Sequence, residues 1–351
     1  MNKPANLKFI ILILFLFASP FILNSCAKPK KQTADKKIEI KKSFYSMGTF
    51  WEIKVVSADK NKAKDMEAVN LAIKRVKELD GILSNFKPSS NVSLINEYSG
   101  IKPVKANPDL LKLLKLSLKF YRLTDNSFDV AIGPIMKIWG FYDKKYTVPS
   151  GIKIKKAVFL SNPSFIEINK NTVFLKKRGM MLDFGGDGEG YGIDEALFVL
   201  EKHGIKNALI NGGGQITAIG KNINGKNWKI GLLNPLYKNG VIKVIKVKNA
   251  SVETSANYEN HFFYKGKYYG HIMNPKTATP ANTSFLSDTV IVRNTDFKLP
   301  STVADALSCA FFILHRKEIA AVMKKLGGHI KVILVKRLGK SRLKIYTLKN
   351  Y

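Results

Sequence analysis

Apolar residues return every three or four positions in several stretches of this chain, which is the period of an amphipathic helix. Between residues 61 and 83 one apolar stripe runs from Ala68 to Leu83. A second stretch follows Asn107-Pro108, where a proline suits the first turn of a helix. We therefore predict helices over residues 61–83, 108–123, 191–203, 301–315 and 317–325.

Shorter apolar runs, bounded by glycine, asparagine and proline, predict strands between these helices. Residues 44–57 predict a strand pair or one bent strand around Met47-Gly48-Thr49, and residues 262–273 predict a hairpin. Many neighbouring strands are joined by short turns, so the predicted fold class is α+β, with mixed, largely antiparallel sheets and packed helices. The remaining strands are predicted over residues 172–184, 207–219, 228–233, 241–248, 288–293, 329–335 and 342–348.

The N-terminal segment has the layout of a secretory signal peptide. Two early lysines precede an apolar run from Phe9 to Leu23, which is too short for a comfortable membrane span. The run ends in Leu23-Asn24-Ser25-Cys26, which resembles a bacterial lipobox, whose cysteine carries the lipid. The alternatives are a cleaved signal with an incidental cysteine, or an uncleaved anchor.

This pattern divides the chain into three parts. We predict a lipoprotein signal peptide over residues 1–25, a lysine-rich tether over residues 26–42 and one domain over residues 43–351. The expected location is outside the cytoplasm, on a membrane that holds the lipid on Cys26, at the periplasmic face or the cell surface. The other cysteine is Cys309, so a lipidated Cys26 leaves no disulfide within the chain.

The composition adds a strong positive charge. The 351 residues carry a formal net charge of +32, and 45% of them are hydrophobic, which excludes a disordered chain. Only seven of the 58 basic residues are arginines, and the lysines are spread over nearly every segment. Nucleic-acid readers favour clustered arginines, so no nucleic-acid partner is predicted.

Several local motifs carry chemistry, although each is weak by itself. The loop Gly185–Gly190 lies between a predicted strand and a predicted helix, where backbone N–H groups can face an anion; a tight turn is the alternative. Its glycine spacing does not match the dinucleotide-binding pattern, and the five histidines are too scattered to indicate a zinc site. Asp305 and Cys309 share one face of a predicted helix, and His271 precedes the turn Asn274-Pro275.

Taken in order, these motifs resemble the ApbE family, the FAD:protein FMN transferases. The resemblance extends over about residues 43–316. Its landmarks are Met47-Gly48-Thr49, Ser84-Asn85-Phe86, Ile95-Asn96, Phe128-Asp129-Val130, Gly133-Pro134, Trp139-Gly140-Phe141, Leu182-Asp183-Phe184-Gly185-Gly186, Glu189-Gly190-Tyr191, Asn211-Gly212-Gly213-Gly214, Thr254-Ser255, His271-Ile272-Met273-Asn274-Pro275, Thr277 and Ala304-Asp305-Ala306-Leu307.

The resemblance implies an enzyme that binds FAD as substrate and, with Mg²⁺, transfers FMN to a Thr or Ser hydroxyl of an acceptor protein while AMP leaves. Two alternatives stay open. One is an FAD diphosphatase, in which water replaces the protein hydroxyl and FMN and AMP are released. The other is an FAD-binding lipoprotein without turnover.

The resemblance also implies site residues. His271 would be the catalytic base, which suits an imidazole at neutral pH, although a structural histidine at a strand end is the alternative. Core packing is the alternative for Met47 and Phe86, and stabilisation of a helix N-terminus is the alternative for Asp183 and Glu189. The implied FAD-binding residues are Met47, Phe86, Ala131, Ile132, Gly133, Asp183, Glu189 and Leu286.

For the metal, the resemblance implies a site formed by Asp305, backbone oxygen of the glycine loop at Gly186, and residue 309. The family places a threonine there, whereas this chain has Cys309. A neutral thiol is a poor ligand for Mg²⁺, so we expect this substitution to weaken the metal site.

Overall fold

The computed structural model describes residues 36–237, 240–257, 260–339 and 342–351. The predicted signal peptide, Cys26 and most of the predicted tether lie outside the described residues. The first strand, β1 (Lys37–Ser46), begins before residue 43, so residues 37–42 are part of this strand and their assignment to the tether is wrong. None of the helices in the four described ranges has the length and apolar character that a membrane crossing requires.

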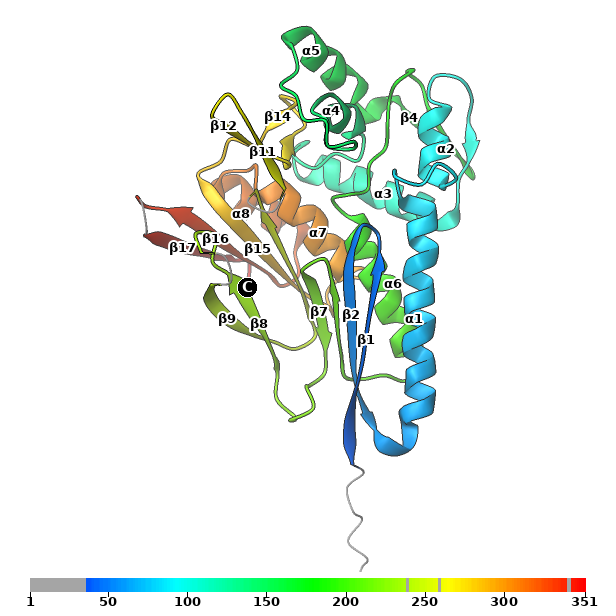
Figure 1. The fold of residues 1–351 in the computed structure, drawn as a ribbon, viewed down its shortest axis with the longest axis vertical. Helices are drawn as coiled ribbons and strands as arrows, with labels where there is room; N and C mark the ends of the chain where they lie inside the picture. The colour runs from blue at the N-terminus through cyan, green and yellow to red at the C-terminus, as the bar shows by residue number, and fades with distance from the viewer. Residues whose placement is uncertain (1–35, 238–239, 258–259, 340–341) are drawn as a thin grey trace, which may run out of the picture. The chain divides into compact units, whose positions relative to one another are not determined.

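The centre of the fold is an eight-stranded sheet in the order β1-β2-β6-β7-β10-β15-β16-β17 (Figure 1). Each neighbouring pair in it is antiparallel, which confirms the predicted α+β class with largely antiparallel pairing. Strands β1 and β17 form its two edges. Strand β17 spans Leu343–Lys349, and the inner strands are β2 (Thr49–Ala58), β6 (Ala208–Gly212), β7 (Gln215–Ile219), β10 (Ala250–Ala256), β15 (Phe285–Arg293) and β16 (Ile330–Arg337).

Long helices cover one face of this sheet. Helices α1 (Lys62–Leu83) and α6 (Gly188–Lys202) share a hydrophobic core with β1, β2 and β6. Helices α7 (Pro300–Phe311) and α8 (Arg316–Leu326) pack in the same way on β15 and β16. The hairpin of β8 (Trp228–Leu233) and β9 (Val241–Val247) shares a second core with the opposite face of the sheet.

Smaller elements gather beyond one end of the sheet, at the top of Figure 1. An aromatic core joins the segment around Tyr146 to the strand that holds Phe262, because the two rings stack with centroids 4.9 Å apart. These elements are α2 (Asn91–Glu97), β3 (Val104–Lys105), α3 (Pro108–Leu123), α4 (Gly133–Ile138), α5 (Gly151–Leu160), β4 (Ile166–Asn169), β5 (Thr172–Leu175), β11 (His261–Tyr264), β12 (Lys267–Gly270), β13 (Met273–Asn274) and β14 (Thr279–Pro280), with short 3₁₀ turns at Asp59–Asn61 and Pro163–Phe165.

Most predicted elements are present, but the short helices α2, α4 and α5 were not predicted, and the strand predicted over residues 207–219 is divided into β6 and β7. Helix α6 begins at Gly188, three residues earlier than predicted. The strand predicted over residues 172–184 is wrong beyond Leu175, where β5 ends. Strand β10 was not predicted at all. The strand pair around residue 47 is confirmed, and its two-residue turn uses the left-handed conformation at both Met47 (φ 51°) and Gly48 (φ 78°).

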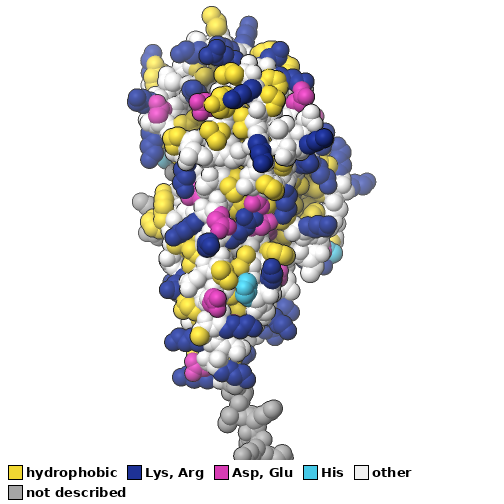
Figure 2. Space-filling model, turned by 90° about the vertical axis from the view of Figure 1, so that its right-hand side faces the viewer, with side chains coloured by type: hydrophobic (Ala, Val, Ile, Leu, Met, Phe, Trp, Pro, Cys, Tyr) yellow, Lys and Arg dark blue, Asp and Glu magenta, His cyan; other side chains and the backbone are white. Residues whose placement is uncertain are grey.

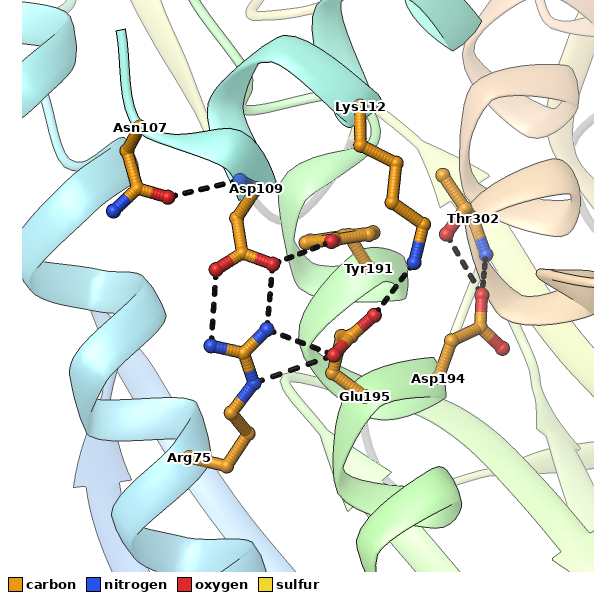
Figure 3. Close-up of polar contacts among 8 residues, drawn as sticks. All are labelled: Arg75, Asn107, Asp109, Lys112, Tyr191, Asp194, Glu195 and Thr302. Atoms are coloured by element: carbon orange, nitrogen blue, oxygen red, sulfur yellow. Dashed lines mark hydrogen bonds and ion pairs between the residues drawn. The ribbon is translucent and has the colours of Figure 1, made fainter.

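An ionic cluster, which we define as Arg75, Asp109, Lys112 and Glu195, joins α1, α3 and α6 (Figure 3). Arg75 donates to both carboxylate oxygens of Asp109 (2.5 and 3.0 Å) and to Glu195 (2.8 Å). Lys112 donates to the second oxygen of Glu195 at 2.8 Å, and the Tyr191 hydroxyl donates to Asp109 at 2.8 Å. Every carboxylate of this cluster therefore has a cationic partner.

The N-terminus of α7 is fixed by a neighbouring carboxylate. Asp194 on α6 accepts hydrogen bonds from the backbone N–H of Ser301 (2.9 Å) and from the N–H and hydroxyl of Thr302 (2.8 and 2.7 Å; Figure 3 draws the contact with Thr302). Burial raises the pKa of Asp194 to about 6, although these hydrogen bonds lower it. The contact sets the position of α7 against α6, and hence of the predicted metal residues on α7.

Candidate active site

Two adjoining hollows lie where the glycine loop meets the smaller elements. The larger has a volume of about 270 Å³ and the smaller of about 90 Å³, and both are lined by Phe86, Asp183 and Gly185. The structure therefore brings together side chains that are far apart in the sequence. Predicted site residues of the larger hollow are Phe86, Ile132, Asp183, Gly186, His271 and Cys309. Those of the smaller hollow are Met47, Phe86, Asp183 and Glu189.

His271 follows β12 directly and lies at the wall of the larger hollow. Its Nδ1 lies 3.0 Å from the backbone carbonyl oxygen of Asn260, which also accepts from the backbone N–H of His271. A carbonyl can only accept, so the hydrogen bond assigns the proton to Nδ1 and leaves Nε2 as the acceptor. Burial lowers the pKa of His271 below its usual value, which favours the neutral imidazole that a base requires.

Asp183 is held in place by two donors. Its Oδ1 accepts from the backbone N–H of Gly185 (2.8 Å) and its Oδ2 from the hydroxyl of Tyr142 (2.5 Å). Burial and the neighbouring carboxylate raise the pKa of Tyr142 well above its usual value, so the hydroxyl keeps its proton. The rings of Tyr142 and Phe86 meet edge to face, 5.9 Å between centroids. Phe86 is 70% exposed, so core packing does not explain this ring.

Tyr142 and Asp129 also line the larger hollow, and neither was predicted as a site residue. Asp129 accepts a hydrogen bond from the backbone N–H of Ala131 at 2.8 Å, and burial raises its pKa to about 8. The N–H of Ala131 is thereby engaged inside the protein. The sequence signal for Asp129 was its place in the motif Phe128-Asp129-Val130, whereas Tyr142 lies just outside every motif.

Three of the predicted FAD-binding residues line neither hollow. Ala131 is fully buried, and Gly133 packs closely on Met181 at the start of α4. Leu286 lies in β15, where a bulge shifts the pairing with β16 between Phe285 and Ser287. Met47 lines the smaller hollow and also packs against two hydrophobic cores; its contact with FAD stays a prediction.

The three predicted metal residues lie where α7 packs against the glycine loop and the first turn of α6. The backbone N–H of Gly190 donates to Oδ2 of Asp305 at 2.9 Å. Gly186 lies against Cys309, since a Cβ atom at residue 186 would be 3.3 Å from Sγ. Burial raises the pKa of the Cys309 thiol well above its usual value, so the thiol is neutral.

Further carboxylates lie near these residues; Asp187 and Asp288 are fully buried and Glu253 is partly buried. We define the acidic cluster as Asp187, Glu253, Asp288 and Asp305. Asp288 is fully buried, and neither of its carboxylate oxygens has a hydrogen-bond partner. Oε2 of Glu253 and Oδ1 of Asp187 are buried without a partner as well. Burial and neighbouring carboxylates raise the pKa of Glu253 and of Asp305 well above their usual values.

This donor set fits a divalent cation, because hard carboxylate oxygens are the ligands that Mg²⁺ prefers and several of them lack any other partner. Within the described ranges, no three His, Cys, Asp or Glu side chains already surround one point closely enough to hold a metal ion. Asp288 was missed in the sequence because an acidic residue in a strand usually marks an exposed face, and Glu253 because no strand was predicted around it.

A comparison with models of protein families shows to which family this chain is related. The model of the ApbE family matches residues 47–334. The chain belongs to the ApbE family. A relative from Buchnera aphidicola subsp. Schizaphis graminum, named FAD:protein FMN transferase, is 30% identical over 293 residues, which are 81% of this chain and 82% of the relative. A relative of the same name from Buchnera aphidicola subsp. Baizongia pistaciae is 31% identical over 71% of this chain and 74% of its own.

Solved structures agree with this membership. The ApbE protein from Thermotoga maritima has a TM-score of 0.74 at 27% identity, over 85% of this chain and 94% of its own. Flavin transferase ApbE from Vibrio cholerae has a TM-score of 0.76 over 89% of this chain and 97% of its own. At 22% identity the second likeness shows the fold alone.

Proposed function

We propose that this protein is an FAD:protein FMN transferase, which moves FMN from FAD to a Thr or Ser hydroxyl of an acceptor protein and releases AMP. The observation that carries the proposal is the neutral His271 in one hollow with Asp183, the glycine loop and Cys309 of α7. Membership of the ApbE family, whose relatives bear this name, supports it.

The side chains of the two hollows have separate tasks in this proposal. The exposed Phe86 offers a ring face on which a flavin or adenine ring stacks. Asp183, held by Tyr142 and Gly185, accepts hydrogen bonds from the nucleotide. Nε2 of His271 accepts the proton of the acceptor hydroxyl, whose oxygen bonds to the phosphorus of the FMN half as the bond to AMP breaks.

Mg²⁺ is the metal that the donor set and the family favour. Asp305, the carbonyl oxygen of Gly186 and the position of Cys309 would hold it, and when bound it would neutralise negative charge on the diphosphate. Other residues of the chain position these ligands. The backbone N–H of Gly190 holds one oxygen of Asp305, and Asp194 holds the N-terminus of α7.

A single assay tests the function and separates its alternatives. The purified protein is incubated with FAD, Mg²⁺ and membrane proteins of its source cell, and flavin fluorescence is read on a denaturing gel. We expect a fluorescent acceptor band and an equal amount of AMP. Free FMN with AMP would instead indicate a diphosphatase, and unchanged FAD would indicate a binding protein without turnover.

The role of His271 has its own test. His271→Ala is expected to lower flavin transfer roughly 10²–10⁴-fold, because the attacking hydroxyl loses its base. Binding of FAD, measured by the quenching of flavin fluorescence, should stay within a few-fold of wild type. Transfer at the wild-type rate would exclude His271 as the base.

The proposal also includes export and a lipid on Cys26, with the membrane and the acceptor protein as partners. The lipobox and the lysine-rich segment after it support this location. Figure 2 shows Lys and Arg side chains scattered among acidic and apolar ones on the face in view. Cys26→Ser should move the protein out of the membrane fraction or leave its precursor unprocessed; fractionation like wild type would contradict the anchor.

A further inference from the structure

We propose that Glu253, with Asp288 beside it, is an additional ligand of the divalent cation at Asp305 and supplies the hard oxygen that Cys309 cannot. The inference rests on the proposed function, since it concerns the metal of the same site. It explains how this chain would tolerate a thiol at a position where its family has a hydroxyl.

The sheet register places the side chains of Glu253 and Asp288 on the face of the sheet that α7 covers. Strands β10 and β15 are antiparallel, and Ser255 pairs with Asp288. Directly paired residues point to one face, and residues two apart on a strand share that face, so Glu253 lies on it as well. The hydroxyl of Ser255 donates to Ser308 at 2.8 Å and lies 4.0 Å from Sγ of Cys309, which shows that this face is the one that α7 covers.

The burial of these groups indicates a missing partner. Asp288 has no exposed surface, and both of its carboxylate oxygens lack a hydrogen bond, as does Oε2 of Glu253. A buried carboxylate without a partner is costly, so such groups are normally paired, hydrogen-bonded or bound to a metal. The charged side chains that act on Glu253 are Asp305, Glu189 and Asp288, all of them acidic.

The alternative to a cation is that the carboxylates stay protonated, since burial raises the pKa of both Glu253 and Asp288 well above the usual values. Protonation leaves the oxygens of Asp288 without a hydrogen-bond partner, whereas a cation would engage them. Each proton is displaced when the metal binds, so the oxygens become ligands. The glutamate side chain has three rotatable bonds, which allow its carboxylate to turn toward Asp305.

The test is a titration of the full chain in detergent with Mn²⁺, followed by electron paramagnetic resonance of the free ion, without FAD. We expect one site in the wild type and an at least tenfold higher dissociation constant in Glu253→Gln and in Asp288→Asn. Glu201→Gln is the matched control, because it removes a carboxylate of α6 outside the acidic cluster and should bind Mn²⁺ like wild type. Both amides keep the side-chain volume, and the melting temperature without metal should not fall.

A rescue variant separates ligation from a general effect on the fold. Cys309→Thr restores a hydroxyl oxygen, so it should recover most of the lost Mn²⁺ affinity in Glu253→Gln and change the wild-type affinity much less. Wild-type affinity in both single variants, or no Mn²⁺ binding by the wild type, would overturn the inference. Failure of the proposed function would appear differently, as Mn²⁺ bound normally by a protein that transfers no flavin.

Discussion

The ionic cluster holds carboxylates between packed helices and the acidic cluster holds them between the sheet and α7, and the charges around the two clusters are opposite. In the ionic cluster, Arg75 and Lys112 neutralise Asp109 and Glu195. Burial alone would raise the pKa of Asp109, but hydrogen bonds from Arg75 and Tyr191 outweigh it and hold the pKa below its usual value. In the acidic cluster, Glu253 and Asp288 keep oxygens without a partner, and burial raises their pKa.

This difference in pairing distinguishes carboxylates that stabilise the fold from carboxylates that are available to bind a ligand. A carboxylate that the chain has already paired contributes to the fold, because its charge is satisfied before any ligand arrives. A buried carboxylate that the chain leaves unpaired costs stability and is retained where it binds something from outside. Variants of the two clusters should therefore affect different measurements.

The largest effect is expected at Asp305. Asp305→Asn removes a charge at the proposed metal site, and loss of one such electrostatic contact should lower AMP release from FAD roughly 10³-fold. The amide oxygen can still accept from Gly190, so the urea midpoint of the metal-free protein should stay the same or rise. A large loss of stability would show that Asp305 belongs with the structural carboxylates.

At Arg75 we expect a loss of stability without a change in metal binding. Arg75→Met leaves Asp109 without its main partner and Glu195 with Lys112 alone, and should lower the free energy of unfolding by about 1–3 kcal/mol, between the values for exposed and for fully buried pairs. Urea denaturation gives the loss, with Arg178→Met as a control for removal of an arginine elsewhere. Mn²⁺ affinity should not change; a weaker metal site would mean that the two clusters are coupled.

The smallest effect is the acid sensitivity of the ionic cluster. The pKa values of Asp109 and Glu195 lie below their usual 3.8 and 4.5, since the hydrogen bonds from the basic partners outweigh burial. Their stabilisation is therefore complete above about pH 5 and is lost as the pH falls through the lowered values. Urea midpoints between pH 6 and pH 3 should fall more steeply in wild type than in Arg75→Met. Equal slopes would contradict the assignment.

Local patterns predicted much of the fold. The turn Met47-Gly48 between two apolar runs predicted β1 and β2, and the proline after Asn107 predicted the start of α3. The side chains His271, Phe86, Asp183 and Cys309 were named from the family resemblance, and the structure places them around one hollow. Their roles stay predictions.

The parts that were not predicted depend on tertiary contacts. Gly190 is inside α6 although glycine is a poor helix former, because a Cβ atom there would lie 2.5 Å from the carbonyl oxygen of Ser301. Strand β10 was missed because Ser251, Glu253 and Ser255 occupy its α7-facing positions, where alternating apolar residues would have signalled a buried strand. The polar residues on this face of β10 are explained only by the tertiary structure, in which α7 packs over them.

The lysines on the two edge strands of the eight-stranded sheet have a consequence for contacts between copies of the protein. An edge strand has unpaired backbone groups and is a template for pairing with another chain. Both edges of this sheet carry lysines, at Lys37, Lys41 and Lys42 on β1 and at Lys344 and Lys349 on β17. Two copies that approached edge to edge would bring like charges together, so the edge lysines oppose pairing between the sheets of two copies.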